Sequence, residues 1–222
     1  DYLRPAGPGH DLHCEAHCFR LTRSVGFVRA EVWQDDRAQP IATAQGAFML
    51  STPAGNQAGA PAAVERPAPA APATVPAPAP STWQPPADTQ PVLPGRSIPY
   101  VDYLGIRMSP GEGGAAPLYR LPYQPKLIGN PHLPALHGGV VAGFAETAAL
   151  LHLVQALQGA RLPKGVEFAI DYLRAGRPVE TFAQCELVRV GARVALVQVR
   201  CWQSAPDNPI VVARGHFLLT AP

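Results

Sequence analysis

The sequence carries little charge, and this argues against several classes of partner. Asp, Glu, Lys and Arg make up 15% of its 222 residues, and the formal net charge is only +2. The basic residues form no run and no patch interleaved with aromatic residues, so we predict no nucleic-acid partner. The four cysteines lie in strand-like stretches without a disulfide framework, which favours a reducing cytoplasm. The first residues also lack the basic and apolar regions of a signal peptide.

What the sequence does contain is one long apolar stretch. Residues 140–157 are apolar around the whole helical wheel, which predicts a helix enclosed by protein. The stretch approaches the length of a membrane span, but Glu146, His152 and Gln155 interrupt it, so we predict no membrane insertion. A carboxylate in such a helix must find partners, have a raised pKa, or face a cavity in which its chemistry is used. Glu146 is therefore the first catalytic candidate, with an inert, hydrogen-bonded acid as the alternative.

The turn that leads into this helix is His137-Gly138-Gly139. Glycine lets the backbone approach a ligand closely, and the first amides of a helix are unpaired donors. These donors suit an oxyanion. The same residues could instead serve only as a tight turn.

The two ends of the chain resemble each other, and this predicts a repeat. Equivalent positions are Tyr2 and Tyr172, Arg20 and Arg189, Val25 and Val194, Trp33 and Trp202, and Phe48 and Phe217. The second copy has alternating, strand-like patterns near residues 165–173, 181–189, 193–203 and 210–220, and the first copy has equivalents of most of them. A further strand near residues 117–123 and the apolar helix precede only the second copy.

We therefore predict two domains of unequal completeness. Residues 1–53 form the strands of the later half of a first domain, and residues 97–222 form a complete second domain. Between them, residues 54–96 are rich in alanine and proline, which favours an extended, semi-rigid tether. A role of this segment as a proline-rich ligand is the alternative.

A cluster near the start, His10, His13, Cys14, His17 and Cys18, has residue types that bind zinc. The repeat, however, aligns this segment with a strand, where alternate side chains point to opposite faces and the candidate ligands separate. We predict no metal site.

Several motifs occur in a characteristic order: Gly129-Asn130-Pro131, Leu136-His137-Gly138-Gly139-Val140-Val141, Glu146-Thr147-Ala148, Asp171-Tyr172-Leu173-Arg174 and Arg189-Val190-Gly191-Ala192-Arg193. Together they resemble the hotdog-fold acyl-CoA thioesterases of the phenylacetic-acid-degradation type. The resemblance implies an α+β fold in which an antiparallel sheet wraps around the apolar helix. It also implies a tandem arrangement whose first hotdog copy is incomplete.

The resemblance implies hydrolysis of an acyl-CoA thioester, with CoA as part of the substrate and no other cofactor. In this family the Gly138 amide would polarise the thioester carbonyl, and Glu146 would act as general base or nucleophile. Asn130 would position the water or the acid, and His137 would shape the turn or hold a hydrogen bond. The candidates for substrate binding are Gly139, Thr147, Arg174 and Arg193, the two arginines for the CoA phosphates.

The chain departs from the family at Leu150, where a polar residue often stands one turn beyond the acid. A second polar contact would then come from a facing hotdog unit, either the first copy or a second chain. A non-catalytic acyl-CoA-binding or scaffold protein is the alternative function.

Overall fold

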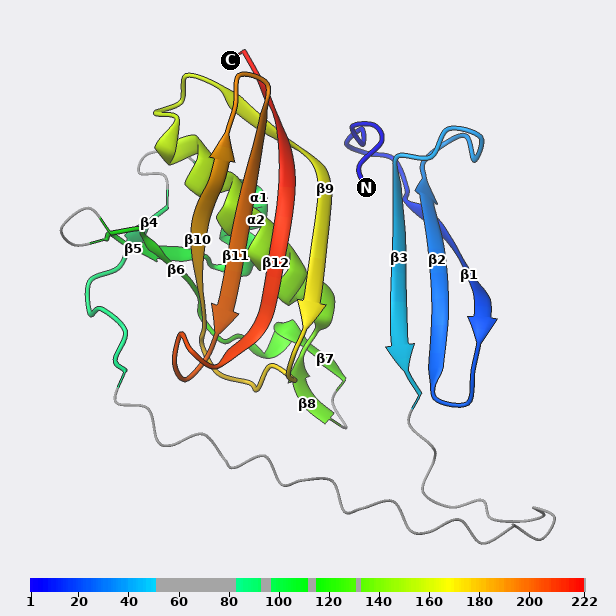
Figure 1. Ribbon diagram of the computed structural model, residues 1–222, viewed down its shortest axis with the longest axis horizontal. Helices are drawn as coiled ribbons and strands as arrows, with labels where there is room; N and C mark the ends of the chain where they lie inside the picture. The colour runs from blue at the N-terminus through cyan, green and yellow to red at the C-terminus, as the bar shows by residue number, and fades with distance from the viewer. Residues whose placement is uncertain (51–82, 93–96, 112–114, 131–132, 222) are drawn as a thin grey trace, which may run out of the picture. The chain divides into compact units, whose positions relative to one another are not determined.

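The computed structural model describes residues 1–50, 83–92, 97–111, 115–130 and 133–221 (Figure 1). The chain forms two compact units, Asp1–Ala79 and Pro80–Pro222, and each is described by itself. Most of the tether predicted at residues 54–96 lies outside the described residues.

The second unit is built on a seven-stranded antiparallel sheet with the order β4-β5-β6-β10-β11-β12-β9. Its strands are β4 (Gln90–Pro91), β5 (Arg107–Ser109), β6 (Leu118–Leu121), β9 (Leu162–Tyr172), β10 (Thr181–Val190), β11 (Val194–Trp202) and β12 (Pro209–Thr220). The other elements are α1 (Pro99–Leu104), a 3-10 turn (Pro125–Leu127), the hairpin of β7 (Ile128–Asn130) and β8 (Leu133–Leu136), and α2 (Gly138–Ala156). The predicted strands and helix are all present, with ends that differ by a few residues.

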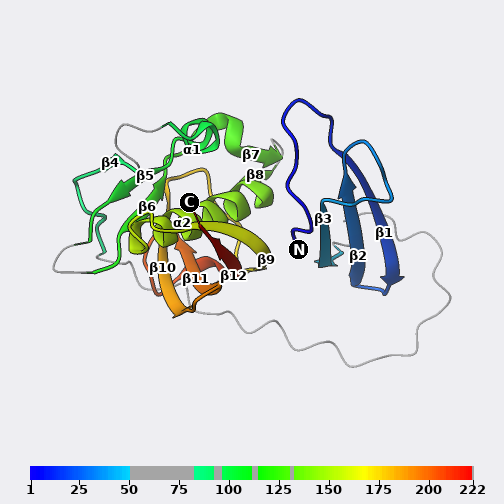
Figure 2. The ribbon, with the colours of Figure 1, turned by 90° about the horizontal axis from the view of Figure 1, so that it is seen from above.

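The core of this unit lies between α2 and the sheet. Figure 2 shows α2 lying against β10, β11 and β12, with α1 on the opposite side of α2. Small helix residues such as Ala145, Ala148 and Ala149 are fully buried and let the helix approach the strands, which present Val197 and Phe217. A sheet wrapped around an apolar helix is the predicted α+β hotdog architecture.

The surroundings of α2 differ from the prediction in one respect. The helix has the length and hydropathy of a membrane span, yet eight of its residues are buried within the unit, as in the core helix of a globular domain. It is not enclosed on every side, however, because the sheet covers only one side of it. The stripe formed by Ala142, Gly143, Glu146, Thr147 and Leu150 is only partly buried.

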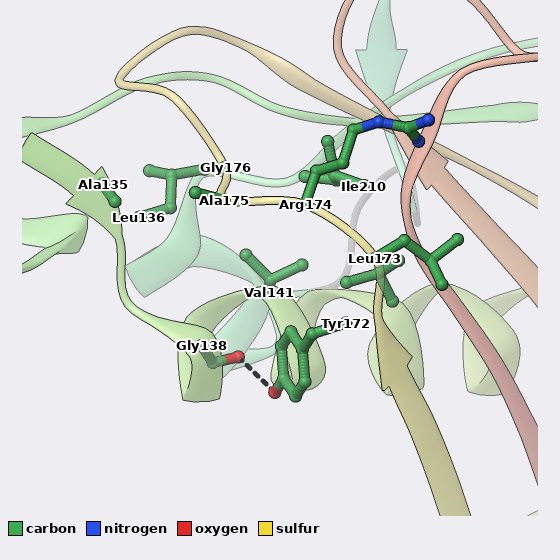
Figure 3. A pocket seen from close by; sticks show the side chains of 11 residues that line it. Ala135, Leu136, Gly138, Val141, Tyr172, Leu173, Arg174, Ala175, Gly176 and Ile210 are labelled. Carbon is green, nitrogen blue, oxygen red and sulfur yellow. Dashed lines mark hydrogen bonds between the residues drawn. The ribbon is translucent and has the colours of Figure 1, made fainter. Parts of the chain in front are cut away.

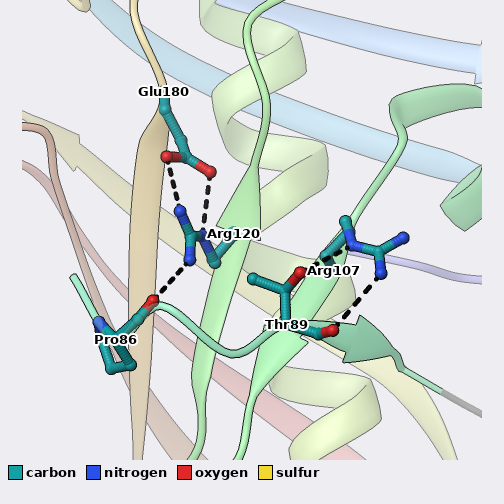
Figure 4. Close-up of polar contacts among 5 residues, drawn as sticks. All are labelled: Pro86, Thr89, Arg107, Arg120 and Glu180. Carbon is teal, nitrogen blue, oxygen red and sulfur yellow. Dashed lines mark hydrogen bonds and ion pairs between the residues drawn. The ribbon is translucent and has the colours of Figure 1, made fainter.

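The residues upstream of α1 belong to the second unit, which begins earlier than the predicted residue 97. The Arg120 guanidinium forms two 2.9 Å bonds to the Glu180 carboxylate and a third to the carbonyl oxygen of Pro86 (Figure 4). The Trp83 ring packs edge-on against Phe182 at a centroid distance of 4.9 Å. These contacts attach residues 83–92 to the sheet.

The first unit is a three-stranded antiparallel sheet of β1 (His13–Leu21), β2 (Val25–Trp33) and β3 (Ala42–Met49). Its pairing follows that of β10, β11 and β12 residue by residue. His13 faces Trp33 as Phe182 faces Trp202, and both first strands contain a register shift at the equivalent place. The Asp-Tyr-Leu-Arg motif repeats its contacts too: Leu3 and Arg4 donate to the Ile41 carbonyl, as Leu173 and Arg174 donate to that of Ile210.

The cluster considered for zinc lies partly on β1, which is a strand as predicted. Cys14 and Cys18 are free thiols. Among the described residues, no group of three or more His, Cys, Asp or Glu side chains is arranged to hold a metal ion.

Candidate active site

His137 forms the N-cap of α2. Its backbone is extended, with φ −62° and ψ 131°, and its Nδ1 atom accepts a 3.0 Å hydrogen bond from the Gly139 amide. This cap explains why the helix begins at Gly138, two residues before the apolar stretch. The preceding hairpin makes room for the imidazole at Gly129, where a Cβ atom would lie 2.8 Å from His137 Cδ2 and 3.0 Å from its Cα. Glycine in the Gly129-Asn130-Pro131 motif therefore has a packing role.

The first backbone amides of α2 differ in whether they have a hydrogen-bond acceptor. The Gly139 amide is bound by His137, and the Val140 and Val141 amides donate to the His137 carbonyl at 2.9 and 3.2 Å. In the part of the chain that the structure describes, no acceptor is recorded for the Gly138 amide. Gly138 thus presents a donor at the positive end of the helix, which is the chemistry that an oxyanion site requires.

A pocket of about 390 Å³ opens beside Gly138 (Figure 3). Leu136, Val141 and Ile210 give it apolar walls, and its size falls within the usual range for small-ligand sites. The Tyr172 hydroxyl also lines the pocket and donates a 2.9 Å hydrogen bond to the Gly138 carbonyl. Partial burial raises the pKa of Tyr172 above its ordinary value, so the phenol stays neutral at neutral pH.

The two candidate arginines lie at opposite ends of the sheet. Arg174 follows β9, lines the pocket and donates from Nη1 to the Pro209 carbonyl at 2.6 Å. Arg193 is exposed in the turn between β10 and β11. Tyr172 pairs with residue 211 of β12, whereas Val194 pairs with residue 218, which separates the two ends by roughly 23 Å. Within this unit, the structure brings Arg174 to Gly138 but not Arg193.

Glu146 lies on the partly buried side of α2, in one row with Gly139 and Gly143. It stands eight residues after Gly138, which corresponds to a rise of about 12 Å along the helix. It is not among the residues that line the pocket beside Gly138. Thr147 lies next to it and is also partly buried. Asn130 ends β7, and its side chain lies outside what the structure describes.

Comparison with known proteins identifies the family. The model of the thioesterase superfamily matches residues 1–41 and 133–209, which is just over half of the chain. The chain belongs to the thioesterase superfamily. The matched segments include the first-unit strands β1 and β2 and, in the second unit, the helix with its glycine turn.

Three solved structures resemble this superfamily member. A protein from Chromobacterium violaceum is 44% identical over 56% of this chain and 85% of its own, with a TM-score of 0.47. A Bacillus halodurans protein solved with CoA is 22% identical over 57% and 81%, with a TM-score of 0.50. A putative thioesterase from Ralstonia eutropha, related to phenylacetic acid degradation, is 14% identical over 55% and 92%, also with a TM-score of 0.50. No curated protein matches the chain.

Sequence reasoning assigned no role to two residues that contact the site. Tyr172 stands inside a motif that the resemblance singled out, but its bond to Gly138 depends on how β9 ends beside the helix. Tyr100 of α1 lies against Gly143 of α2, and it belongs to no motif that could have singled it out.

Proposed function

We propose that this member of the superfamily hydrolyses an acyl-CoA thioester to the free acid and CoA. Thioester hydrolysis is the general activity of the superfamily, and the acyl-CoA substrate is the finer part of the proposal. The observation that carries it is the Gly138 amide, which stands at the start of α2 beside a largely apolar pocket and has no acceptor among the residues that the structure describes. No metal or further cofactor is part of the proposed reaction.

In the proposed reaction, the thioester carbonyl oxygen accepts a hydrogen bond from the Gly138 amide. Charge that develops on this oxygen is stabilised by the amide and by the helix dipole. The Tyr172 hydroxyl, bound to the Gly138 carbonyl, holds this residue in place. Glu146 either takes a proton from the attacking water or attacks the carbonyl carbon itself to give an anhydride that water then cleaves. In both routes the C–S bond breaks and CoA leaves as the thiolate, which takes up a proton.

The distance between the Gly138 amide and the Glu146 carboxylate determines how the site is assembled. A general base must lie within hydrogen-bonding reach of the water that it activates, but Glu146 stands about two helical turns from Gly138. We therefore propose that one unit supplies the amide and a facing unit supplies the carboxylate. The facing unit is either the first copy or a second chain.

The proposed substrate contacts extend from this centre. Gly139 and Thr147 border the acyl thioester, Asn130 positions the water or the acid, and Arg174 contacts the CoA phosphates from the edge of the pocket. Arg193 would reach CoA only from a facing unit. The presence of CoA in the Bacillus halodurans structure supports a CoA ester as the ligand class. The four free cysteines are in keeping with our proposal of a cytoplasmic protein.

The test is to incubate the protein with a panel of acyl-CoA esters and to measure released CoA with a thiol reagent. Turnover by the wild type supports the proposal. Arg174→Ala should raise KM for the best substrate, and Arg193→Ala should do so only if a facing unit brings it to the ligand. Tight binding of acyl-CoA without release would favour the non-catalytic binding protein, and the absence of both would favour a scaffold.

A further inference from the structure

Helix α1 places an aromatic hydroxyl on the side of α2 that the sheet leaves partly open. α1 is a short helix, anchored by the buried side chains Val101 and Leu104. Figure 2 shows it on the far side of α2 from β10, β11 and β12. Tyr100, the second residue of α1, keeps 48% of its surface exposed while its hydroxyl reaches α2. Its helix is thus anchored in the core, while Tyr100 itself stays about half exposed.

The hydroxyl of Tyr100 is seated at Gly143, in space that a Cβ atom on this residue would occupy. A Cβ atom on residue 143 would overlap the Tyr100 hydroxyl oxygen and lie 3.3 Å from the ring carbon that bears it. Glu146 is the residue three positions further along the helix. Residues at this spacing share a face, with Cβ atoms about 5–6 Å apart. A hydroxyl at the place of the missing Gly143 Cβ is therefore within reach of the Glu146 carboxylate.

The electrostatics of Tyr100 agree with this placement. Its pKa is raised by partial burial first, then by the negative charge of Glu146, and then by Tyr103 on its own helix. The phenol is consequently neutral at the pH of a thioesterase assay and available as a hydrogen-bond donor.

We propose that Tyr100 is a positioning residue, whose hydroxyl, seated against Gly143, orients the Glu146 carboxylate for attack on the thioester or on water. This inference rests on the proposed function, since it gives Glu146 its chemical role. The hydroxyl also favours the ionised carboxylate, because a donor stabilises the charged form. Gly143 serves the same purpose by leaving the space in which the hydroxyl lies.

The first test compares Tyr100→Phe with Tyr103→Phe, the same change on the same helix at a side chain that faces Lys126 instead. Tyr100→Phe should move the acidic limb of the pH profile of kcat/KM upward by about 0.5–1 pH unit and lower kcat more than it changes KM. Tyr103→Phe should leave the profile in place. Gly143→Ala should reproduce the Tyr100→Phe profile and should add little in the Tyr100→Phe background.

A second readout does not need turnover. In protein labelled with ¹³C at the tyrosine ζ carbon, Glu146→Gln should lower the titration midpoint of Tyr100, since the neighbouring negative charge is removed. An unchanged Tyr100 titration would overturn the inference. So would an unchanged pH profile in an active Tyr100→Phe protein. Failure of the wild type to release CoA would instead refute the proposed function, so the two failures are distinguishable.

Discussion

The oxyanion role of Gly138 predicts that replacing it with proline will remove activity but not the helix. Proline lacks the amide hydrogen, so Gly138→Pro deletes the proposed donor. The local backbone accepts this change: proline is favoured at the first position of a helix, and the φ and ψ angles of His137 suit a residue before proline. Gly138 is also not among the described glycines with positive φ.

The size of the effect follows from the loss of one donor. Removal of a single oxyanion donor typically costs about 10²–10³ in kcat. Gly138→Ala is the matched control, because it keeps the amide and its Cβ would lie 3.5 Å from the Tyr172 ring, an ordinary contact. Rates of CoA release and thermal unfolding would be measured together. A folded Gly138→Pro protein with near wild-type kcat would refute the oxyanion assignment.

The same variant tests whether the site is shared between two chains. If Gly138 of one chain acts with Glu146 of another, a mixture of Gly138→Pro and Glu146→Gln proteins forms some sites with neither change. Random pairing in a two-fold dimer would restore about a quarter of the wild-type activity. No recovery after verified subunit exchange would refute a site shared between two chains.

Three further predictions concern the cap, a buried imidazole and an ion pair. His137→Ala should cost about 1 kcal/mol of stability, because it removes the acceptor for the Gly139 amide in the first turn of α2. His137→Asn should recover most of this stability. A stable but inactive His137→Asn protein would show that the imidazole takes part in the chemistry. The pKa of His152 is lowered by burial, so below pH ~6.5 the unfolded state binds a proton that the folded state does not. The free energy of unfolding should therefore decrease as the pH is lowered below this value. His152→Leu should remove this pH dependence, as measured by urea unfolding. Arg120→Lys should lower the free energy of unfolding by about 1–3 kcal/mol, because it breaks the paired bonds to Glu180. Arg107→Lys, at an exposed site, should change it little, and thermal unfolding of both variants would measure the difference.

Most of the fold could be predicted because it follows from local patterns. The alternation of apolar and polar residues predicts strands β9 to β12, and the apolar run predicts α2. The repeat in the first copy supported three of these strands independently. The start of α2 was placed two residues late, because the cap depends on the hydrogen bond that His137 accepts from the Gly139 amide, which hydropathy does not report. The attachment of residues 83–92 was also missed, since it depends on Trp83 and on Arg120, which is distant in sequence.

The parts of the candidate site could be proposed from the sequence, but not their arrangement. The glycine turn and the acid were proposed from their chemistry and from the family motifs, and their roles stay predictions. Their separation of two turns, the position of Arg193 at the far end of the sheet, and the contacts of Tyr100 and Tyr172 all depend on how distant segments pack. The partly open stripe of α2 likewise reflects how much of the helix one sheet can cover.

The most direct measurement of the central claim is the rate of CoA release by Glu146→Gln at saturating acyl-CoA, in protein whose circular dichroism and unfolding temperature match the wild type. We predict a loss of about 10³-fold or more in kcat, because the carboxylate performs the proton transfer or the attack. A well-folded Glu146→Gln protein that keeps kcat within a factor of about ten of the wild type, a change too small for loss of such a group, would contradict the account.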